Sequence, residues 1–244
     1  MCCFTRPVER VEQTRIFARA EGALQLVVYE MKLRVSEDVA MVLPVPTAHG
    51  SGQGAIDFVD LTSSPTFFAG LAYAFRPEEL TAQALRHAPR GNTLAVQQVG
   101  SFEASFVPSA RDFDRLDPRF ALPSGFWDRV PDVRGFGFVV FKLRTPKRGV
   151  LSTYHPMAFW FPRGDRDRLF FPTLHVHDGA LHADARFDHV LYAQTSASID
   201  GWETSKFAMR DGVGGAGREL VLPAPGRRRI LHGVLPNRDE WINA

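Results

Sequence analysis

A continuous apolar run occupies residues 39–45, Val39-Ala40-Met41-Val42-Leu43-Pro44-Val45. A half-exposed strand alternates apolar and polar residues, so a short run without polar positions predicts a buried strand. Proline has no N–H to donate to a neighbouring strand, and Pro44 and Pro46 therefore predict where this strand ends. The run indicates a β-sheet in the interior of the protein.

Strand patterns extend in both directions from this run. Residues 14–19 and 24–35 are rich in β-branched and aromatic side chains on either side of Glu21-Gly22, which predicts a hairpin. Further strands are expected at 56–61, 93–99, 102–107 and 136–143. Helical spacing, proline at a first turn and a capping box predict helices at 65–75, 77–87 and 109–116.

The second half of the chain is predicted as an antiparallel meander. Its strands are expected at 154–161, 169–177 and 187–195, with turns at 164–167 and 178–184. The Gly- and Pro-rich tail from Gly201 is left unassigned. The order of elements predicts an α+β fold: mostly antiparallel β-sheet with a few short helices, in a single domain over residues 1–244.

Composition argues against several functional classes. The sequence has 29 Lys and Arg against 27 Asp and Glu, and its dense basic run is only Arg227-Arg228-Arg229; we therefore expect no nucleic-acid partner. No segment approaches the ~18 consecutive apolar residues of a membrane span, and the start of the chain lacks the pattern of a signal peptide. We expect a cytoplasmic protein with no membrane partner, whose adjacent Cys2 and Cys3 are free thiols.

Two short motifs carry a resemblance to a known family. Cys2-Cys3-Phe4 and Val42-Leu43-Pro44-Val45-Pro46 resemble a bacterial domain-of-unknown-function family whose mature chains begin Cys-Cys or Cys-Gly and then carry a Leu-Pro-Val-Pro segment. Weaker likeness at 99–103 and 136–143 extends it loosely over residues 2–145. Members are usually secreted, whereas this sequence shows no signal peptide. The resemblance implies no activity.

Four histidines form the leading candidate site. His175 and His177 are two residues apart, so on a strand both imidazoles point to the same side. In the predicted meander, His155 and His189 fall opposite them, which brings His155, His175, His177 and His189 to one height. Imidazole is a ligand of zinc, copper and iron, and Asp178 or Asp188 could orient such a ligand. The pattern predicts a metal-binding protein, with zinc as the first expectation and copper or iron as alternatives, and with metal-dependent catalysis left open.

Two other interpretations compete with the metal site. Removal of Met1 would place the Cys2 thiol beside an α-amino group, the arrangement of N-terminal-nucleophile hydrolases, and Cys2 is then the candidate catalytic residue. Alternatively, the histidines are surface residues of half-exposed strands and the protein is a non-catalytic binding or scaffold domain. In that case its partner is a small molecule or a peptide that the sequence does not identify.

Overall fold

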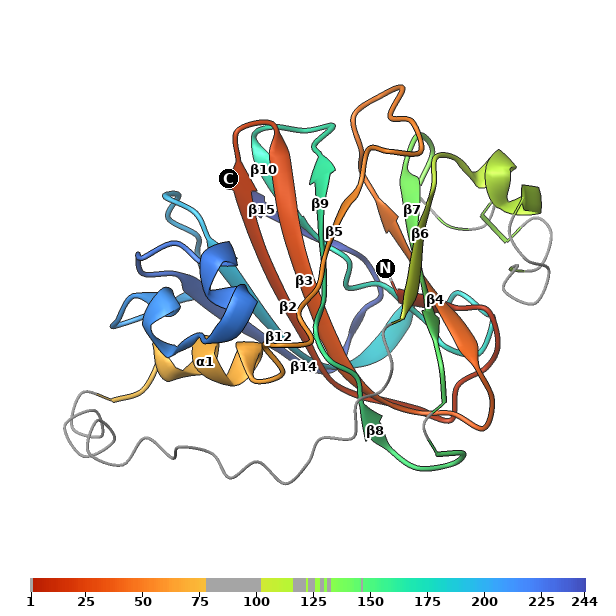
Figure 1. The fold of residues 1–244 in the computed structure, drawn as a ribbon, viewed down its shortest axis with the longest axis horizontal. Helices are drawn as coiled ribbons and strands as arrows, with labels where there is room; N and C mark the ends of the chain where they lie inside the picture. Colours follow the sequence, from red (N-terminus) through yellow and green to blue (C-terminus); the bar gives the residue numbers. More distant parts are fainter. Residues whose placement is uncertain are drawn as a thin grey trace.

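Two β-sheets face each other across a shared core (Figure 1). The computed structural model describes residues 2–77, 102–115, 122, 126, 127, 130, 133–145 and 147–244. The smaller sheet has five strands in the order β11 (His175–Val176), β1 (Cys2–Phe4), β4 (Val39–Val45), β7 (Gly137–Leu143) and β6 (Glu103–Val107). The larger sheet has eight strands, and a two-stranded ribbon pairs β10 (Arg168–Phe171) with β15 (Glu240–Asn243).

The larger sheet combines segments from the whole length of the chain. Its main path runs β13 (Glu203–Thr204), β14 (Arg227–Pro236), β12 (Asp184–Gln194), β2 (Arg10–Glu21), β3 (Leu24–Arg34), β9 (Met157–Pro162) and β5 (Asp57–Val59), with β8 (Ser152–Thr153) also paired to β3. Most neighbours are antiparallel, but β12 lies parallel to β2, with Leu191 opposite Ile16. Strands that are far apart in the sequence therefore lie side by side at the centre of this sheet.

Strand β4 is buried on both faces, which explains its unbroken apolar run. Met41 and Leu43 point into the core between the sheets, where they join residues of β3 and β9. Ala40 and Val42 point to the opposite face. That outer face is covered by Phe113, Phe126, Val130 and Val133, from the segment between β6 and β7.

The outer face of the larger sheet is covered by helix α1 (Phe67–Tyr73) and two 3₁₀ helices, η4 (Met209–Gly212) and η5 (Gly215–Leu220) (Figure 1). Phe67, Phe68 and Leu71 of α1 pack on Phe17, Leu26 and Val28 of the sheet. Glycine permits the closest approach: a Cβ placed on Gly70 would lie 2.4 Å from the carbonyl oxygen of Gly212. The helix and η4 are therefore in backbone contact.

The predicted fold class is confirmed, because the structure is mostly antiparallel β-sheet with little helix. The hairpin around Glu21-Gly22 is present as β2 and β3, and Gly22 takes a positive φ of 55°. The expected helix at 109–116 is a 3₁₀ helix, η1 (Ala110–Arg115), where the Ser109 hydroxyl donates to Asp112 at 2.7 Å. The helix expected at 77–87 and the strand expected at 93–99 lie outside the described residues, except for residue 77.

The predicted meander is wrong. Strand β9 pairs with β3 and β5 rather than with β10, and β10 pairs with β15. The expected strand at 169–177 divides into β10 and β11, and β11 pairs with β1 rather than with β12. Pairing of sequence neighbours failed here because the N-terminal strands and the C-terminal tail occupy the positions beside these segments.

The unassigned tail contributes strands to both the larger sheet and the ribbon. The basic run at 227–229 begins β14. There Arg228 donates through Nε to Glu203 of β13 at 3.0 Å and lies over the ring of Phe75 at 4.5 Å. The stem of Arg228 covers apolar surface while its charge is paired with Glu203, so a charged residue occupies this strand without loss of packing.

Among the helices of the described residues, none is long and apolar enough to cross a membrane.

The contact between α1 and η4 predicts that Gly70→Ala is destabilising. The new methyl group would meet backbone atoms of Gly212, which cannot move as a side chain can, so we expect a loss of about 1–3 kcal/mol in the free energy of unfolding. Gly54→Ala is the matched control, because its Cβ meets nothing within 4 Å, and it should cost nothing or stabilise by up to about 1 kcal/mol. Urea denaturation measures both; equal stabilities would contradict the packing described.

Candidate metal centre

His175 and His177 lie on and just after β11, a two-residue strand that is held at both edges. On one edge β11 pairs in parallel with β1, which places Cys2 opposite His175. On the other edge the amide of Asn237 acts as a strand would: its Oδ1 accepts the His175 N–H at 2.8 Å and its Nδ2 donates to the His175 carbonyl at 2.9 Å. The backbone position of His175 is therefore fixed from two sides.

His189 reaches the same place from the opposite sheet. It lies on β12, where Phe187, His189 and Leu191 are buried at alternating positions. Phe187 and Leu191 belong to the core between the sheets, and alternation along a strand gives His189 the same direction. The side chain of His189 is 1% exposed and that of His175 is 9% exposed.

The imidazole of His175 contacts the other two. The ring centroid of His175 lies 4.9 Å from that of His177 and 4.5 Å from that of His189. Nδ1 of His175 lies 3.3 Å from Nε2 of His177. Aromatic rings enclose the group, because Phe187 contacts His175 and His189 at 4.4 and 5.1 Å and Phe4 contacts His177 at 5.6 Å. We call His175, His177 and His189 the histidine trio.

Burial keeps the trio uncharged. Loss of solvation lowers the pKa of His175 to about 2 and that of His177 to about 4, with repulsion from His189 as the second cause in each. Burial also lowers the pKa of His189. At neutral pH all three rings are neutral imidazoles, the form that offers a lone pair.

Two buried nitrogen atoms of the trio have no hydrogen-bond partner among the described residues. They are Nε2 of His175 and Nδ1 of His189. Nδ1 of His189 lies 3.7 Å from Oδ1 of Asp188, which is within ion-pair distance but beyond a hydrogen bond. Asp188 is held in turn by the N–H of Gln13, which donates to Oδ2 at 2.6 Å.

A β-bulge supplies that hydrogen bond. The register of β2 against β3 shifts between Glu12 and Arg15. Gln13, inside the bulge, has a φ of 53°, a left-handed conformation that is unusual for a residue with a side chain. Bulges turn backbone groups away from the ladder, and here the freed N–H holds Asp188 beside His189.

Cys2 and Cys3 face opposite sides of the smaller sheet. Cys2 belongs to the core between the sheets, whereas Cys3 packs with Val176 and Leu174 on the outer face. The Cys2 thiol hydrogen-bonds the hydroxyl of Tyr29, and burial raises the pKa of Cys2 to about 12. Both cysteines are free thiols, as predicted, and both are buried. Cys2 alone lies on the side of the trio.

His155 lies apart from the trio. Its ring lies against Phe102, with the centroids 4.0 Å apart, and its Nδ1 lies 3.1 Å from the carbonyl oxygen of Pro156. Burial lowers the pKa of His155, and the negative charge of Asp60 partly opposes this effect. The prediction that placed His155 with the others depended on a hairpin of β9 with β10. Because those strands do not pair, the expected convergence of four histidines is replaced by a convergence of three.

The arrangement lacks a complete ligand set. In the part of the chain that the structure describes, no group of three or more His, Cys, Asp or Glu side chains is disposed to hold a metal ion. Asp178, the other predicted orienting carboxylate, pairs with His182 at 2.8 Å. Sequence reasoning missed Tyr29 and Gln13, since nothing distinguishes a tyrosine in an apolar strand or a bulged glutamine.

The depressed pKa of His175 predicts a loss of stability in acid. Below its usual value of 6.5 the unfolded chain takes up a proton that folded His175 refuses until about pH 2. The free energy of unfolding should therefore decrease as the pH decreases below 6.5, by at most about 1.4 kcal/mol per pH unit for this group. His175→Gln should flatten the dependence between pH 6.5 and 4.5, as measured by urea denaturation.

The wild type must be compared with His175→Gln, because Glu30 changes the pH dependence of stability in the direction opposite to His175. Burial raises the pKa of Glu30 from 4.5 to about 7, so its proton uptake favours the folded state as pH falls from 7 to 4.5. Glu30 is present in both proteins and cancels in the difference. Parallel curves for the two proteins would contradict the neutral, buried state of His175.

Comparisons with known proteins identify no family. No family model matches the sequence, and no curated protein matches it. A chain of the crystal structure of the caspase-8/p35 complex is similar over 95% of this chain and 96% of that one, at 9% sequence identity and a TM-score of 0.45. Similarity at this level carries no argument about function.

Proposed function

We propose that the protein binds a transition metal ion through the histidine trio. The observation that carries the proposal is the contact of His175 with the imidazoles of His177 and His189: two buried rings and one half-buried ring, all neutral, from two different sheets. Burying a polar ring without a partner is costly, and two nitrogens of the trio have none. A metal ion bound through one nitrogen of each ring would offset part of the cost of burying the group.

The spacing of the nearest two nitrogens suits a tetrahedral ion. Zinc binds imidazole at about 2.0–2.1 Å, which separates two tetrahedral ligand nitrogens by about 3.3–3.4 Å. Nδ1 of His175 and Nε2 of His177 are 3.3 Å apart. The same distance also fits a weak hydrogen bond between the rings, so it supports the proposal only together with the third ring.

His189 is the proposed third ligand. Its Nδ1 faces Asp188, which leaves Nε2 for the ion and gives the carboxylate the orienting role usual beside a metal-bound histidine. Because no group of three donors in the described residues is already set for a metal, binding requires a rotation within the trio. Cys2, opposite His175 on β1, is the proposed fourth ligand, and coordination would remove its thiol proton.

Metal titration of the purified protein tests this assignment. We expect about one equivalent of Zn²⁺ or Co²⁺ per chain in protein prepared without a His tag and first treated with chelator. His175→Ala with His177→Ala should abolish binding, and His189→Ala should weaken it about 10–100-fold or more. Inductively coupled plasma mass spectrometry gives the stoichiometry, and the visible absorption of Co²⁺ reports the geometry and any thiolate ligand.

His155→Ala and His182→Ala are the matched controls. Each removes one imidazole outside the trio, so each should bind as the wild type does. Equal loss in a control, or binding that survives removal of His175 and His177, would refute the assignment. Circular dichroism of each variant separates loss of the site from loss of the fold.

The hydrolase alternative receives no support from the surroundings of Cys2. A reactive cysteine is partly exposed and has a lowered pKa, whereas Cys2 is 2% exposed and burial raises its pKa to about 12. Its backbone N–H donates to the Leu174 carbonyl at 2.5 Å, inside the sheet. A nucleophile in this position would first have to leave β1.

Timed alkylation tests the inert state of the thiols. With iodoacetamide at pH 8, Cys2 and Cys3 of the native, metal-free protein should react at least about a hundredfold more slowly than in guanidinium chloride, because burial disfavours the thiolate. Peptide mass mapping follows each cysteine separately. Rapid, stoichiometric alkylation of native Cys2 alone would instead favour the hydrolase.

A further inference from the structure

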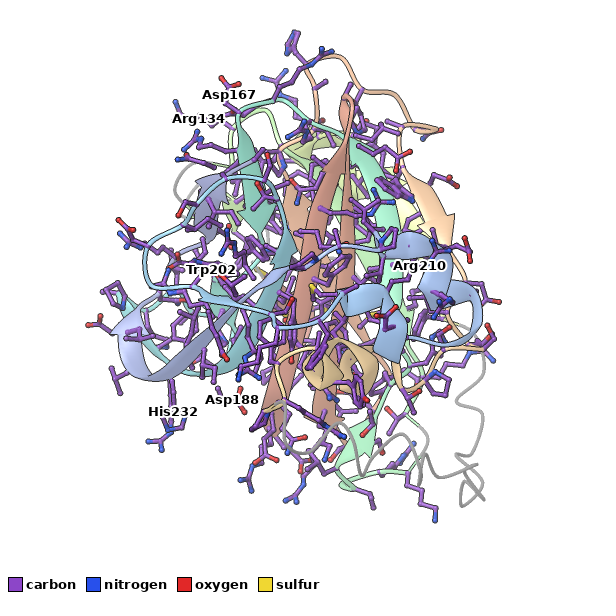
Figure 2. All side chains as sticks on the ribbon, turned by 90° about the vertical axis from the view of Figure 1, so that its left-hand side faces the viewer. Arg134, Asp167, Asp188, Trp202, Arg210 and His232 are labelled. Carbon is purple, nitrogen blue, oxygen red and sulfur yellow. The ribbon has the colours of Figure 1, made fainter. Side chains whose placement is uncertain are left out.

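A cavity of about 690 Å³ is lined by residues outside the histidine trio. It is lined by the segment after β4, the segment before β7, the turn between β9 and β10 with part of β10, Leu174, and the connection from β14 to β15 with Trp241 of β15. In Figure 2 Arg134, which lines it, is near the upper end of the molecule, whereas Asp188 beside the trio is near the lower end. The volume is within the range of about 300–1,000 Å³ typical of sites for small molecules.

The acidic side chains that line the cavity have hydrogen-bond partners, whereas two of its arginines have none among the described residues. Asp165 accepts from Nε of Arg168 at 2.7 Å, and Asp239 accepts the N–H of Leu174 at 2.9 Å. The side chains of Arg134 and Arg238 are exposed and have no hydrogen-bond or ion-pair partner among the described residues. Two guanidinium groups are therefore available to a ligand, while both carboxylates already have partners.

Aromatic rings form the apolar part of the lining. Phe170 contacts Trp241 at 4.8 Å and Phe136 at 5.9 Å, the latter edge to face. The guanidinium group of Arg168 lies over the ring of Trp241, 4.6 Å from its centroid. Trp241 and Phe136 are each only partly buried, which leaves aromatic surface for a flat group to contact.

We propose that this cavity binds a small organic anion that carries a flat apolar group. Arg134 and Arg238 pair with its carboxylate or phosphate, because a guanidinium presents two parallel N–H groups to such an anion. Phe136 and Trp241 contact the flat group. None of the lining residues belongs to the histidine trio, although Leu174 directly precedes His175 in the chain.

Two probes of equal shape test the proposal. 2-Naphthoate carries the anion and the flat group, and 2-naphthamide has the same rings without the charge. We expect saturable 1:1 binding of 2-naphthoate by isothermal titration calorimetry, at least about tenfold tighter than that of 2-naphthamide. The titrations contain EDTA, so failure of the metal proposal would not affect them.

Substitutions assign the binding to the two arginines. Arg134→Gln with Arg238→Gln should weaken 2-naphthoate about tenfold or more and leave 2-naphthamide unchanged. Lys147→Gln with Arg148→Gln removes the same charge from exposed positions between β7 and β8, and binding should stay as in the wild type. All four substituted residues are exposed, so the fold should be retained, which circular dichroism checks.

Three outcomes would overturn the proposal. One is the absence of saturable 2-naphthoate binding. Another is equal affinity for the two probes, which would show a merely apolar cavity. The third is an equal loss in the two double variants, which would show a general effect of net charge rather than a site.

Discussion

The candidate site depends on the insertion of a three-residue strand, β1, between β4 and β11. All three residues of β1 are buried, so its backbone groups must find partners inside the protein. The pairing with β11 satisfies part of that need and places His175 directly beside Cys2. Without β1, strand β11 would lose its only sheet neighbour among the described strands, and the trio would lose its alignment.

Burial determines the chemistry of both candidate ligand types. It holds the imidazoles neutral, which makes them available as ligands, and it holds the Cys2 thiol protonated, which makes it unreactive as a nucleophile. One environment therefore leaves the imidazoles with free lone pairs and disfavours hydrolysis by Cys2.

Local patterns predicted individual elements well where a strand or turn depends on its own residues. The run at 39–45 is a buried strand with those same limits, and Glu21-Gly22 lies at the turn of the hairpin. The same reasoning predicted that His175 and His177 share a face, because period-two alternation needs no knowledge of neighbours. It also predicted that His189 lies near His175, but on the assumption that their strands pair in one sheet. In the structure β12 faces β11 across the core and is not its sheet neighbour.

The sequence by itself determined the β-rich class, the buried strand at 39–45 and the pair His175 and His177. The tertiary structure decided which strands pair, and with that the exclusion of His155, the approach of His189 and the position of Cys2. The physical reason is that sheet pairing is non-local: β2 pairs with β12 and β10 with β15 across long separations in the chain. Such pairings depend on packing summed over the whole core, which no local segment of sequence encodes.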